Sequence, residues 1–208
     1  ELSAEEMAQG EHLDRALSHP FTLQDGAGYL VEFRGRDKAG NEAEAVTVAD
    51  VRFDVAPPVY TVSFPLSNSY VREPTFSFDV NENLKEATLM WERTGGEADP
   101  GAPHPVSLSG AELTAGSHPD VSPTEAVNLV NGAVYSLSLK ATDLAGNAGE
   151  AVTVSGLTFD DIPPVLAVAS PVSASFTNNL RVSYTNSEVL ASGTVTWTQI
   201  GGAADGNS

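Results

Sequence analysis

The sequence repeats itself at a fixed interval of 106 residues, and this repeat constrains the fold more than any other feature. Residues 28–58 read GYLVEFRGRDKAGNEAEAVTVADVRFDVAPP and return at residues 134–164 as VYSLSLKATDLAGNAGEAVTVSGLTFDDIPP. The interval holds without a gap, and 37 of the 102 positions that can be compared are identical. Self-similarity of this kind indicates an array of similar units, each with its own core.

The interval divides the chain into one complete repeat and two partial ones. Residues 1–56 form the C-terminal half of a repeat, residues 57–162 form a complete repeat, and residues 163–208 form the N-terminal half of a third. Length alone would allow one large domain or two ordinary ones, since a domain averages roughly 150 residues. We therefore expect this sequence to be part of a longer array.

Alternating apolar and polar residues predict short β-strands along the complete repeat. Residues 135–142 alternate Tyr, Leu, Leu and Ala with Ser, Ser, Lys and Thr, which is the period of a strand with one buried face. The same period places Phe76 and Phe78 on one face of a strand, and Leu89 and Trp91 on the inner face of another. We predict an all-β fold of about seven strands per repeat and no long helix, with residues 95–105 as a loop and residues 111–116 as a short turn.

Two local motifs indicate how these strands are connected. Leu-x-x-Gly-x-x-Tyr ends at Tyr135 and, in the first copy, at Tyr29, which is the spacing of the tyrosine corner in immunoglobulin-like β-sandwiches. After the strand that follows Tyr135, the segment from Asp143 to Asn147 reads Asp-Leu-Ala-Gly-Asn, in which Gly accepts positive φ and Asp bonds the nearby backbone. This segment predicts a hairpin between the last two strands of the repeat.

Taken together, these residues resemble a known family. Tyr-x-Leu-x-Leu-x-Ala-x-Asp-x-Ala-Gly-Asn, followed by Phe-Asp-x-x-Pro-Pro, is similar to the Ig-like, or fibronectin-type-III-like, tandem repeats of large bacterial surface and secreted adhesin-like proteins. The resemblance covers the whole chain. It implies export to the cell surface or the extracellular space and a role as a spacer or adhesive stalk that holds a distal domain away from the cell.

The expected topology brings acidic residues together where one repeat meets the next. Asp54 comes from the linker, Glu82 from the loop between two early strands, and Asp143 and Asn147 from the last hairpin. All four offer oxygen atoms suited to a hard cation, so we predict a junctional Ca²⁺ site. Calcium between repeats is also what the resemblance implies. The alternative is that Asp143 only forms its turn.

Other chemistry-bearing residues favour structural roles. His12 and His118 each have too few neighbouring ligands for a metal, so we expect loop hydrogen bonds instead. Trp91 and Trp197 would bind sugar if exposed, but their alternation with polar residues predicts burial. No catalytic motif for hydrolysis or phosphate binding is present, and we expect no enzyme.

Charge and composition narrow the set of partners. The formal net charge of −18 would repel nucleic acid and anionic membrane surfaces, and no apolar run approaches the roughly 20 residues of a membrane span. Without cysteine, the chain forms neither disulfides nor thiolate metal sites. The expected partners are the neighbouring repeats, with a cell-surface glycan or a protein as further candidates. A carbohydrate- or protein-binding module, or an accessory domain of a secreted hydrolase, are alternatives to the spacer.

Overall fold

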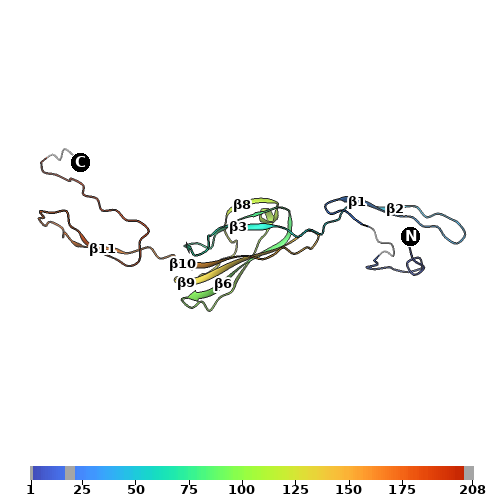
Figure 1. Ribbon diagram of the computed structural model, residues 1–208, viewed down its shortest axis with the longest axis horizontal. Coiled ribbons are helices and arrows are strands. Elements are labelled where there is room, and N and C mark those ends of the chain that lie inside the picture. Colours follow the sequence, from blue (N-terminus) through green and yellow to red (C-terminus); the bar gives the residue numbers. More distant parts are fainter. Residues whose placement is uncertain (1, 17–21, 204–208) are drawn as a thin grey trace. The chain divides into compact units, whose positions relative to one another are not determined.

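A computed structural model describes residues 2–16 and 22–203 of the chain (Figure 1). The chain divides into two units, one that ends at Asp160 and one that begins at Asp161. The predictions made for residues 1, 17–21 and 204–208 lie outside the described residues. All regular structure within the described ranges is β-strand apart from one short 3-10 turn, so the all-β prediction is confirmed.

The complete repeat is a β-sandwich of eight strands, one more than predicted. A five-stranded sheet has the order β4-β10-β9-β6-β7, and a three-stranded sheet has the order β3-β5-β8. Figure 1 shows β3 and β8 in one layer, above β6, β9 and β10 in the other. The strands are β3 (Tyr60–Phe64), β4 (Tyr70–Val71), β5 (Phe76–Val80), β6 (Leu84–Gly96), β7 (His104–Ser107), β8 (Gly116–Val121), β9 (Ala133–Asp143) and β10 (Val152–Phe159).

The core of the sandwich follows the alternation of the sequence. Tyr135, Leu137 and Leu139 on β9 are fully buried, and the residues between them are only partly buried. Trp91 on β6 is also fully buried, and its ring meets that of Tyr135 edge to face at 6.3 Å between centroids. Both sheets contribute to one continuous core, in which Phe76 of β5 belongs to the same hydrophobic cluster. The inward placement of Trp91 is therefore confirmed.

The predicted loop at residues 95–105 is shorter than expected. Gly95 and Gly96 still belong to β6, and His104 and Pro105 already belong to β7, so that only residues 97–103 connect the two strands. The strands extend because Gly95 and Gly96 pair with the first residues of β9 across a local irregularity in register. Gly and Pro composition suggested a loop, but sheet pairing with a distant strand overrode this local signal. The predicted turn at residues 111–116 overlaps the 3-10 turn η1 (Gly110–Leu113), and its last residue, Gly116, already begins β8.

The first partial repeat contains one hairpin, formed by β1 (Gly28–Phe33) and β2 (Val46–Arg52). Its local hydrogen bonds repeat those of the complete repeat. Tyr29 accepts a hydrogen bond at its hydroxyl oxygen from Gln24 N at 2.7 Å, just as Tyr135 accepts one from Val130 N at 2.9 Å. This is the bond that the tyrosine-corner spacing predicts.

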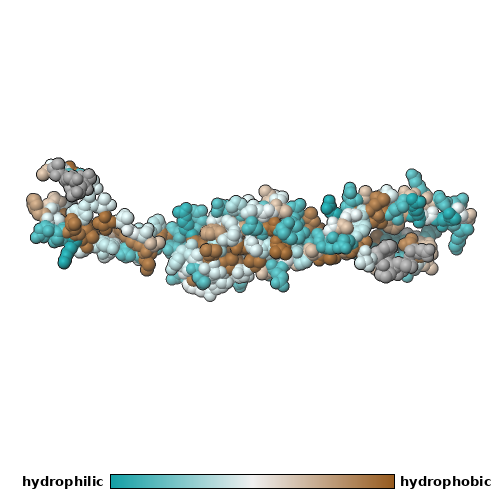
Figure 2. All heavy atoms as spheres, turned by 45° about the horizontal axis from the view of Figure 1, so that its top comes forward, coloured by the Kyte–Doolittle hydropathy of each residue, from teal (hydrophilic) through white to brown (hydrophobic). Residues whose placement is uncertain are grey.

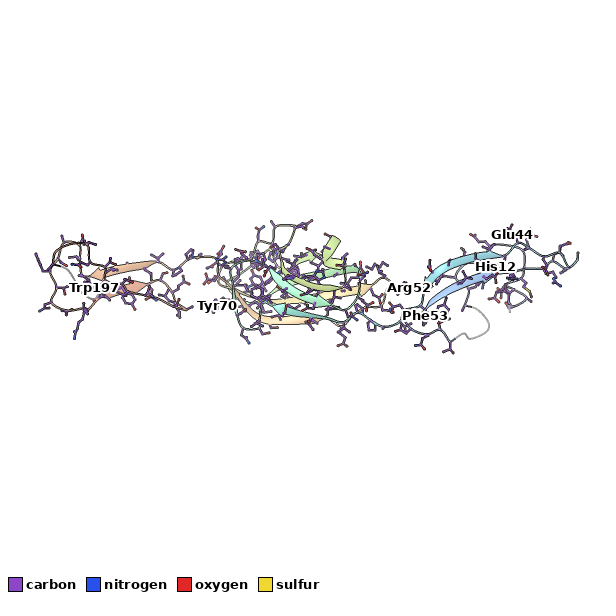
Figure 3. All side chains as sticks on the ribbon, turned by 90° about the horizontal axis from the view of Figure 1, so that it is seen from above. His12, Glu44, Arg52, Phe53, Tyr70 and Trp197 are labelled. Carbon is purple, nitrogen blue, oxygen red and sulfur yellow. The ribbon has the colours of Figure 1, made fainter. Side chains whose placement is uncertain are left out.

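The second unit also contains one hairpin, formed by β11 (Leu166–Ser170) and β12 (Ser183–Asn186). The residues that correspond to β6 by the repeat interval, including Trp197, form no strand. The prediction that Trp197 is buried is wrong, since the residue is 49% exposed. Figure 3 marks its position in the second unit. Trp197 lies outside any strand, whereas Trp91 lies on β6 and its ring contacts that of Tyr135 on β9. No described helix is long and apolar enough to cross a membrane.

Candidate functional site

Three carboxylates meet at the end of the complete repeat where the preceding segment enters it. Asp54 lies in the stretch between β2 and β3, Glu82 in the turn between β5 and β6, and Asp143 is the last residue of β9. One oxygen atom from each lies within 4.8 Å of the other two. The structure therefore brings together three of the four residues predicted from sequence as cation ligands, and we call these three the acidic cluster.

Asp143 is the fixed member of the acidic cluster. Its side chain is fully buried, and its Oδ1 accepts hydrogen bonds from Gly146 N at 2.7 Å and from Asn147 N at 2.8 Å. Burial opposes ionisation, but these bonds and the one from the Asn147 side chain outweigh it and lower the pKa of Asp143. The carboxylate is thus held charged in one orientation at neutral pH.

Asn147 joins the hairpin to the incoming segment. Its Nδ2 donates to Asp143 Oδ2 at 2.7 Å and to the Asp54 carbonyl oxygen at 3.1 Å. The side chain therefore acts as a hydrogen-bond donor toward the cluster, and it joins Asn147 to a residue 93 positions earlier in the chain. Its predicted role as an oxygen ligand stays a prediction, because it would require the amide to turn over.

The surroundings of Glu82 disfavour the ionised form of its carboxyl group. Partial burial raises its pKa, and the charges of Asp54 and Asp143 raise it further. None of the ion pairs found among the described residues involves a member of the acidic cluster. The three carboxylates therefore repel one another without a cationic side chain to offset the repulsion.

Asp25 is a fourth acidic residue at this junction, and the sequence reasoning missed it. Its Oδ1 accepts a hydrogen bond from Val55 N at 2.8 Å, and its charge also raises the pKa of Glu82. The signal was present in the sequence, because Asp25 precedes Gly26 in the tyrosine-corner motif, and Gly26 N donates to the carbonyl oxygen of Phe53 beside the linker. The matching residue of the second copy is Asn131, so a comparison of the two copies gives no second carboxylate at this position.

The donor set suits a hard divalent cation. Carboxylate oxygens are the ligands that Ca²⁺ prefers, and Ca²⁺ tolerates irregular geometry with six to eight oxygen atoms, some of them from water. Partial burial and then the charges of Asp54 and Asp143 raise the pKa of Glu82. A bound cation would offset the repulsion among the three carboxylates, which fits a cation at this place. A metal ion could therefore be held by the acidic cluster.

A second polar cluster lies at the opposite end of β9. The Tyr135 hydroxyl donates to Asp99 Oδ2 at 2.7 Å, and His104 Nε2 lies 2.7 Å from the same oxygen atom. The Asp99 side chain is 3% exposed, and these two partners lower its pKa to about 2. Burial and the neighbouring Asp99 raise the pKa of Tyr135 to about 12. This arrangement ties residues 97–103 to the tyrosine corner.

The two histidines singled out from the sequence make the expected loop hydrogen bonds. His12 Nε2 donates to the Ala8 carbonyl oxygen at 2.9 Å, and His118 Nε2 donates to that of Thr114 at 2.8 Å. The spacing of four residues is the same in both copies. Their prediction as backbone-bonded side chains is confirmed.

Comparison with known proteins leaves the family open. No family model matches the chain, and no curated protein matches it. One similar solved structure is the crystal structure of an engineered protein, with 18% identity and a TM-score of 0.30. The match covers 53% of this chain and 21% of that one.

Proposed function

We propose that the chain is a structural spacer, made of tandem Ig-like repeats, from an extracellular or cell-surface adhesin-like protein of a bacterium. Its task would be to hold a distal domain at a distance from the cell, without catalysis. The observation that carries the proposal is the way in which the linker between β2 and β3 is bonded from both of its sides.

The preceding repeat bonds one side of this linker and the complete repeat bonds the other. Asp25 accepts the hydrogen bond from Val55 N, and Asn147 donates to the Asp54 carbonyl oxygen. Pro57 and Pro58 follow at once and favour extended backbone. A linker whose backbone is bonded by both neighbours loses the freedom of a flexible tether, which is the property that a spacer needs.

The strand order supports the Ig-like interpretation. With the two-residue β4 left aside, the sheet of three strands joins the first, second and fifth strands of the repeat (β3, β5 and β8), and the other sheet joins the third, fourth, sixth and seventh (β6, β7, β9 and β10). β4 adds to the edge of β10 in parallel, as the first strand of an Ig-like domain does when it crosses to the second sheet. The tyrosine-corner hydrogen bond at Tyr135 supports the same interpretation.

We further propose that Ca²⁺ occupies the acidic cluster and stiffens the junction. The cluster combines the linker, through Asp54, with two loops of the complete repeat, through Glu82 and Asp143. A cation bound to all three would add a cross-link between the linker and the complete repeat.

Distance measurement across the junction tests the spacer. The chain contains no cysteine, so Thr47→Cys and Lys85→Cys, both at exposed positions, would carry the only two spin labels. Labelled chain is diluted into unlabelled chain so that only distances within one molecule are read. We expect one narrow distance distribution, which Asn147→Ala broadens.

The matched control for this experiment is Asn41→Ala. Asn41 occupies the same place in the first copy, where it is exposed and donates to Asp37 of its own hairpin at 2.7 Å. This variant should leave the distribution narrow. A distribution as broad in the parent chain as in Asn147→Ala would contradict the spacer and favour a flexible tether.

Thermal unfolding with Ca²⁺ and with chelator tests the cation. A cation that binds only the folded state stabilises it by about 2.7 kcal/mol at 100 times its dissociation constant. We expect Ca²⁺ to raise the unfolding midpoint of the parent chain. Glu82→Gln should raise the midpoint in chelator, because it removes one repelling charge, and should reduce the response to Ca²⁺. An equal midpoint with and without Ca²⁺ would leave the acidic cluster as turn-forming residues.

A further inference from the structure

A tyrosine of the complete repeat is exposed on a strand whose next residue is buried. Tyr70 is 76% exposed, whereas Val71, which follows it on β4, is 4% exposed. Successive residues of a strand point to opposite faces, so the burial of Val71 directs the Tyr70 side chain away from the core. Figure 3 marks Tyr70 at one end of the complete repeat, and Figure 2 shows that hydrophobic residues also reach the surface of this part of the chain.

The backbone that carries Tyr70 is fixed by β10. The two strands are parallel, and Tyr70 lies opposite Thr158. On one side of Tyr70, the Ser69 carbonyl oxygen accepts a hydrogen bond from Thr158 N at 3.0 Å. On the other side, the Val71 carbonyl oxygen accepts one from Asp160 N at 2.9 Å. A ring on a fixed backbone loses little conformational freedom when a ligand binds to it, which favours affinity.

The same residue types recur one repeat interval later. The interval carries Tyr70 onto Phe176 and Leu66 onto Val172, so an aromatic and an aliphatic residue keep their places although neither residue is identical. Core positions keep apolar residues because they are buried, but Leu66 is 68% exposed in the complete repeat and Tyr70 is more exposed still. Packing of the core therefore does not explain why this pair is apolar in both copies.

The turn before the aromatic residue also keeps its backbone conformation. Asn68 and its counterpart Ala174 both have φ of 61°. Positive φ is uncommon for residues other than glycine, so its occurrence at the same place in two copies marks a defined turn. Ser67 is exposed in the complete repeat, and its counterpart Ser173 is identical. Each copy thus places a hydroxyl group in the turn three positions before the aromatic ring.

These groups suit a sugar ring. The C–H bonds of a pyranose form an apolar face that stacks on the negative face of an aromatic ring, while the sugar hydroxyls bond polar groups nearby. A stable protein partner typically buries about 800 Å² on each side, which is more than one ring and one aliphatic side chain provide. The net charge of −18 repels acidic glycans. The chemistry therefore favours a neutral glycan.

We propose that Tyr70 is the stacking platform of a binding site for a neutral polysaccharide, and that Phe176 forms the equivalent site in the next copy. A single stacked sugar binds weakly. A polysaccharide presents many sugar units, however, so two rings on one chain bind it jointly and with higher affinity. This inference goes beyond the spacer function and does not depend on it.

A microarray of neutral and acidic glycans, probed with the whole chain, tests the ligand class. We expect binding to at least one neutral polysaccharide and none to acidic ones. Binding to no neutral glycan, or stronger binding to acidic glycans, would overturn the proposal. If the chain bound no glycan but formed dimers that Tyr70→Ala abolishes in light scattering, the exposed ring would instead be a contact between copies.

Variants of Tyr70 test the platform by affinity electrophoresis in gels that contain the bound polysaccharide. Tyr70→Ala should raise the dissociation constant by about tenfold or more, because it removes one of two jointly acting rings. Tyr70→Phe should bind as well as the parent, since the third repeat carries Phe at this place. Equal urea midpoints for Tyr70→Ala and the parent verify that the fold is unchanged.

The matched control is Leu144→Ala, which removes another exposed apolar side chain of the complete repeat. It should leave the retardation unchanged, and a loss as large as that of Tyr70→Ala would show non-specific adhesion and overturn the site. Phe176→Ala tests the second ring. We expect it to weaken binding by itself and to abolish detectable binding together with Tyr70→Ala. A Phe176→Ala variant that binds like the parent would overturn the second site.

Discussion

Asp143 and Asp37 show how burial changes the contribution that similar hydrogen bonds make to stability. Asp37 Oδ1 accepts from Ala39 N and Asn41 N at 2.9 and 2.8 Å, much as Asp143 Oδ1 accepts from two backbone N–H groups. Asp37 is exposed, whereas Asp143 is fully buried beneath the incoming linker. Water replaces the bonds of an exposed carboxylate but cannot reach those of a buried one.

Removing the carboxylate of Asp143 should therefore lower the free energy of unfolding more than removing that of Asp37. Asp143→Ala removes the acceptor of Asn147 N and leaves Gly146 N only the carbonyl oxygen of residue 143, at 3.2 Å. We expect it to lower the free energy of unfolding of the complete repeat by about 1 to 3 kcal/mol. Asp37→Ala should lower it by less than about 0.5 kcal/mol. Urea unfolding followed by circular dichroism gives both values. Equal losses would show that the hairpin, rather than its burial, determines the effect.

Asp99 makes the stability of the complete repeat depend on pH in the acidic range. Its pKa in the folded state is about 2, below the ordinary value of 3.8, so folding favours the ionised carboxylate. The resulting stabilisation is complete above about pH 4 and is lost as the pH falls through about 2. Asp99→Asn should flatten this part of the curve of urea midpoint against pH. As a control, Asp79→Asn at an exposed position on β5 should leave the curve unchanged. Parallel curves for the parent chain and Asp99→Asn would contradict the role of Asp99 in the loss of stability at low pH.

At the scale of the element, the pairing of β6 with β9 explains most of the fold. The alternation that predicted both strands was sufficient to place their buried faces, because a period of two residues depends only on neighbours in the chain. The strand β4 was missed because it has only two residues and exists through its pairing with β10. Short edge strands of this kind carry no periodic signal of their own.

The end of β6 requires a glycine for a steric reason. Gly96 has φ +67°, and a Cβ there would overlap the carbonyl oxygen of Gly132. We expect Gly96→Ala to cost about 3 kcal/mol or more. Gly110→Ala is the matched control, since Gly110 has φ +58° but no atom near its missing Cβ, and it should cost only about 1 to 2 kcal/mol. Chemical denaturation measures both, and an equal cost would mean that backbone strain alone acts at Gly96.

At the scale of the whole molecule, the described core belongs to the complete repeat alone. Every buried core residue lies between Tyr60 and Phe159, whereas the hairpins on either side expose their apolar residues. A cooperative unfolding transition should therefore report on the complete repeat, and the partial repeats should contribute little to it.

The two tryptophans test this distribution of stability. They occupy the same position in successive repeats, but Trp91 is fully buried and Trp197 is 49% exposed. Trp91→Ala should lower the free energy of unfolding of the complete repeat by about 3 to 5 kcal/mol. Trp197→Ala should leave it within about 0.5 kcal/mol in dilute solution, as measured by calorimetry. An equal shift from both variants would show that the second unit shares the core.

The candidate site was predictable in part. The hairpin from Asp143 to Asn147 and the position of Asp54 in the linker follow from local motifs, and the topology expected for the repeat placed Glu82 near them. The position of Asp25 in the tyrosine-corner motif was a usable signal, but its hydrogen bond from Val55 N depends on the folded path of the chain. The donor role of Asn147 was not predictable, because it depends on which of its atoms faces the linker after folding.

The sequence by itself determined the repeat interval, the strand periodicity, the hairpin motif and the tyrosine corner. Each of these depends on residues that are close together in the chain, or on a direct comparison of two copies. Only the tertiary structure decided that Asp143 is buried and Asp37 is not, and that Asp99 reaches Tyr135 across 36 positions. Such contacts depend on the path of the whole backbone, since they join groups that no local pattern relates.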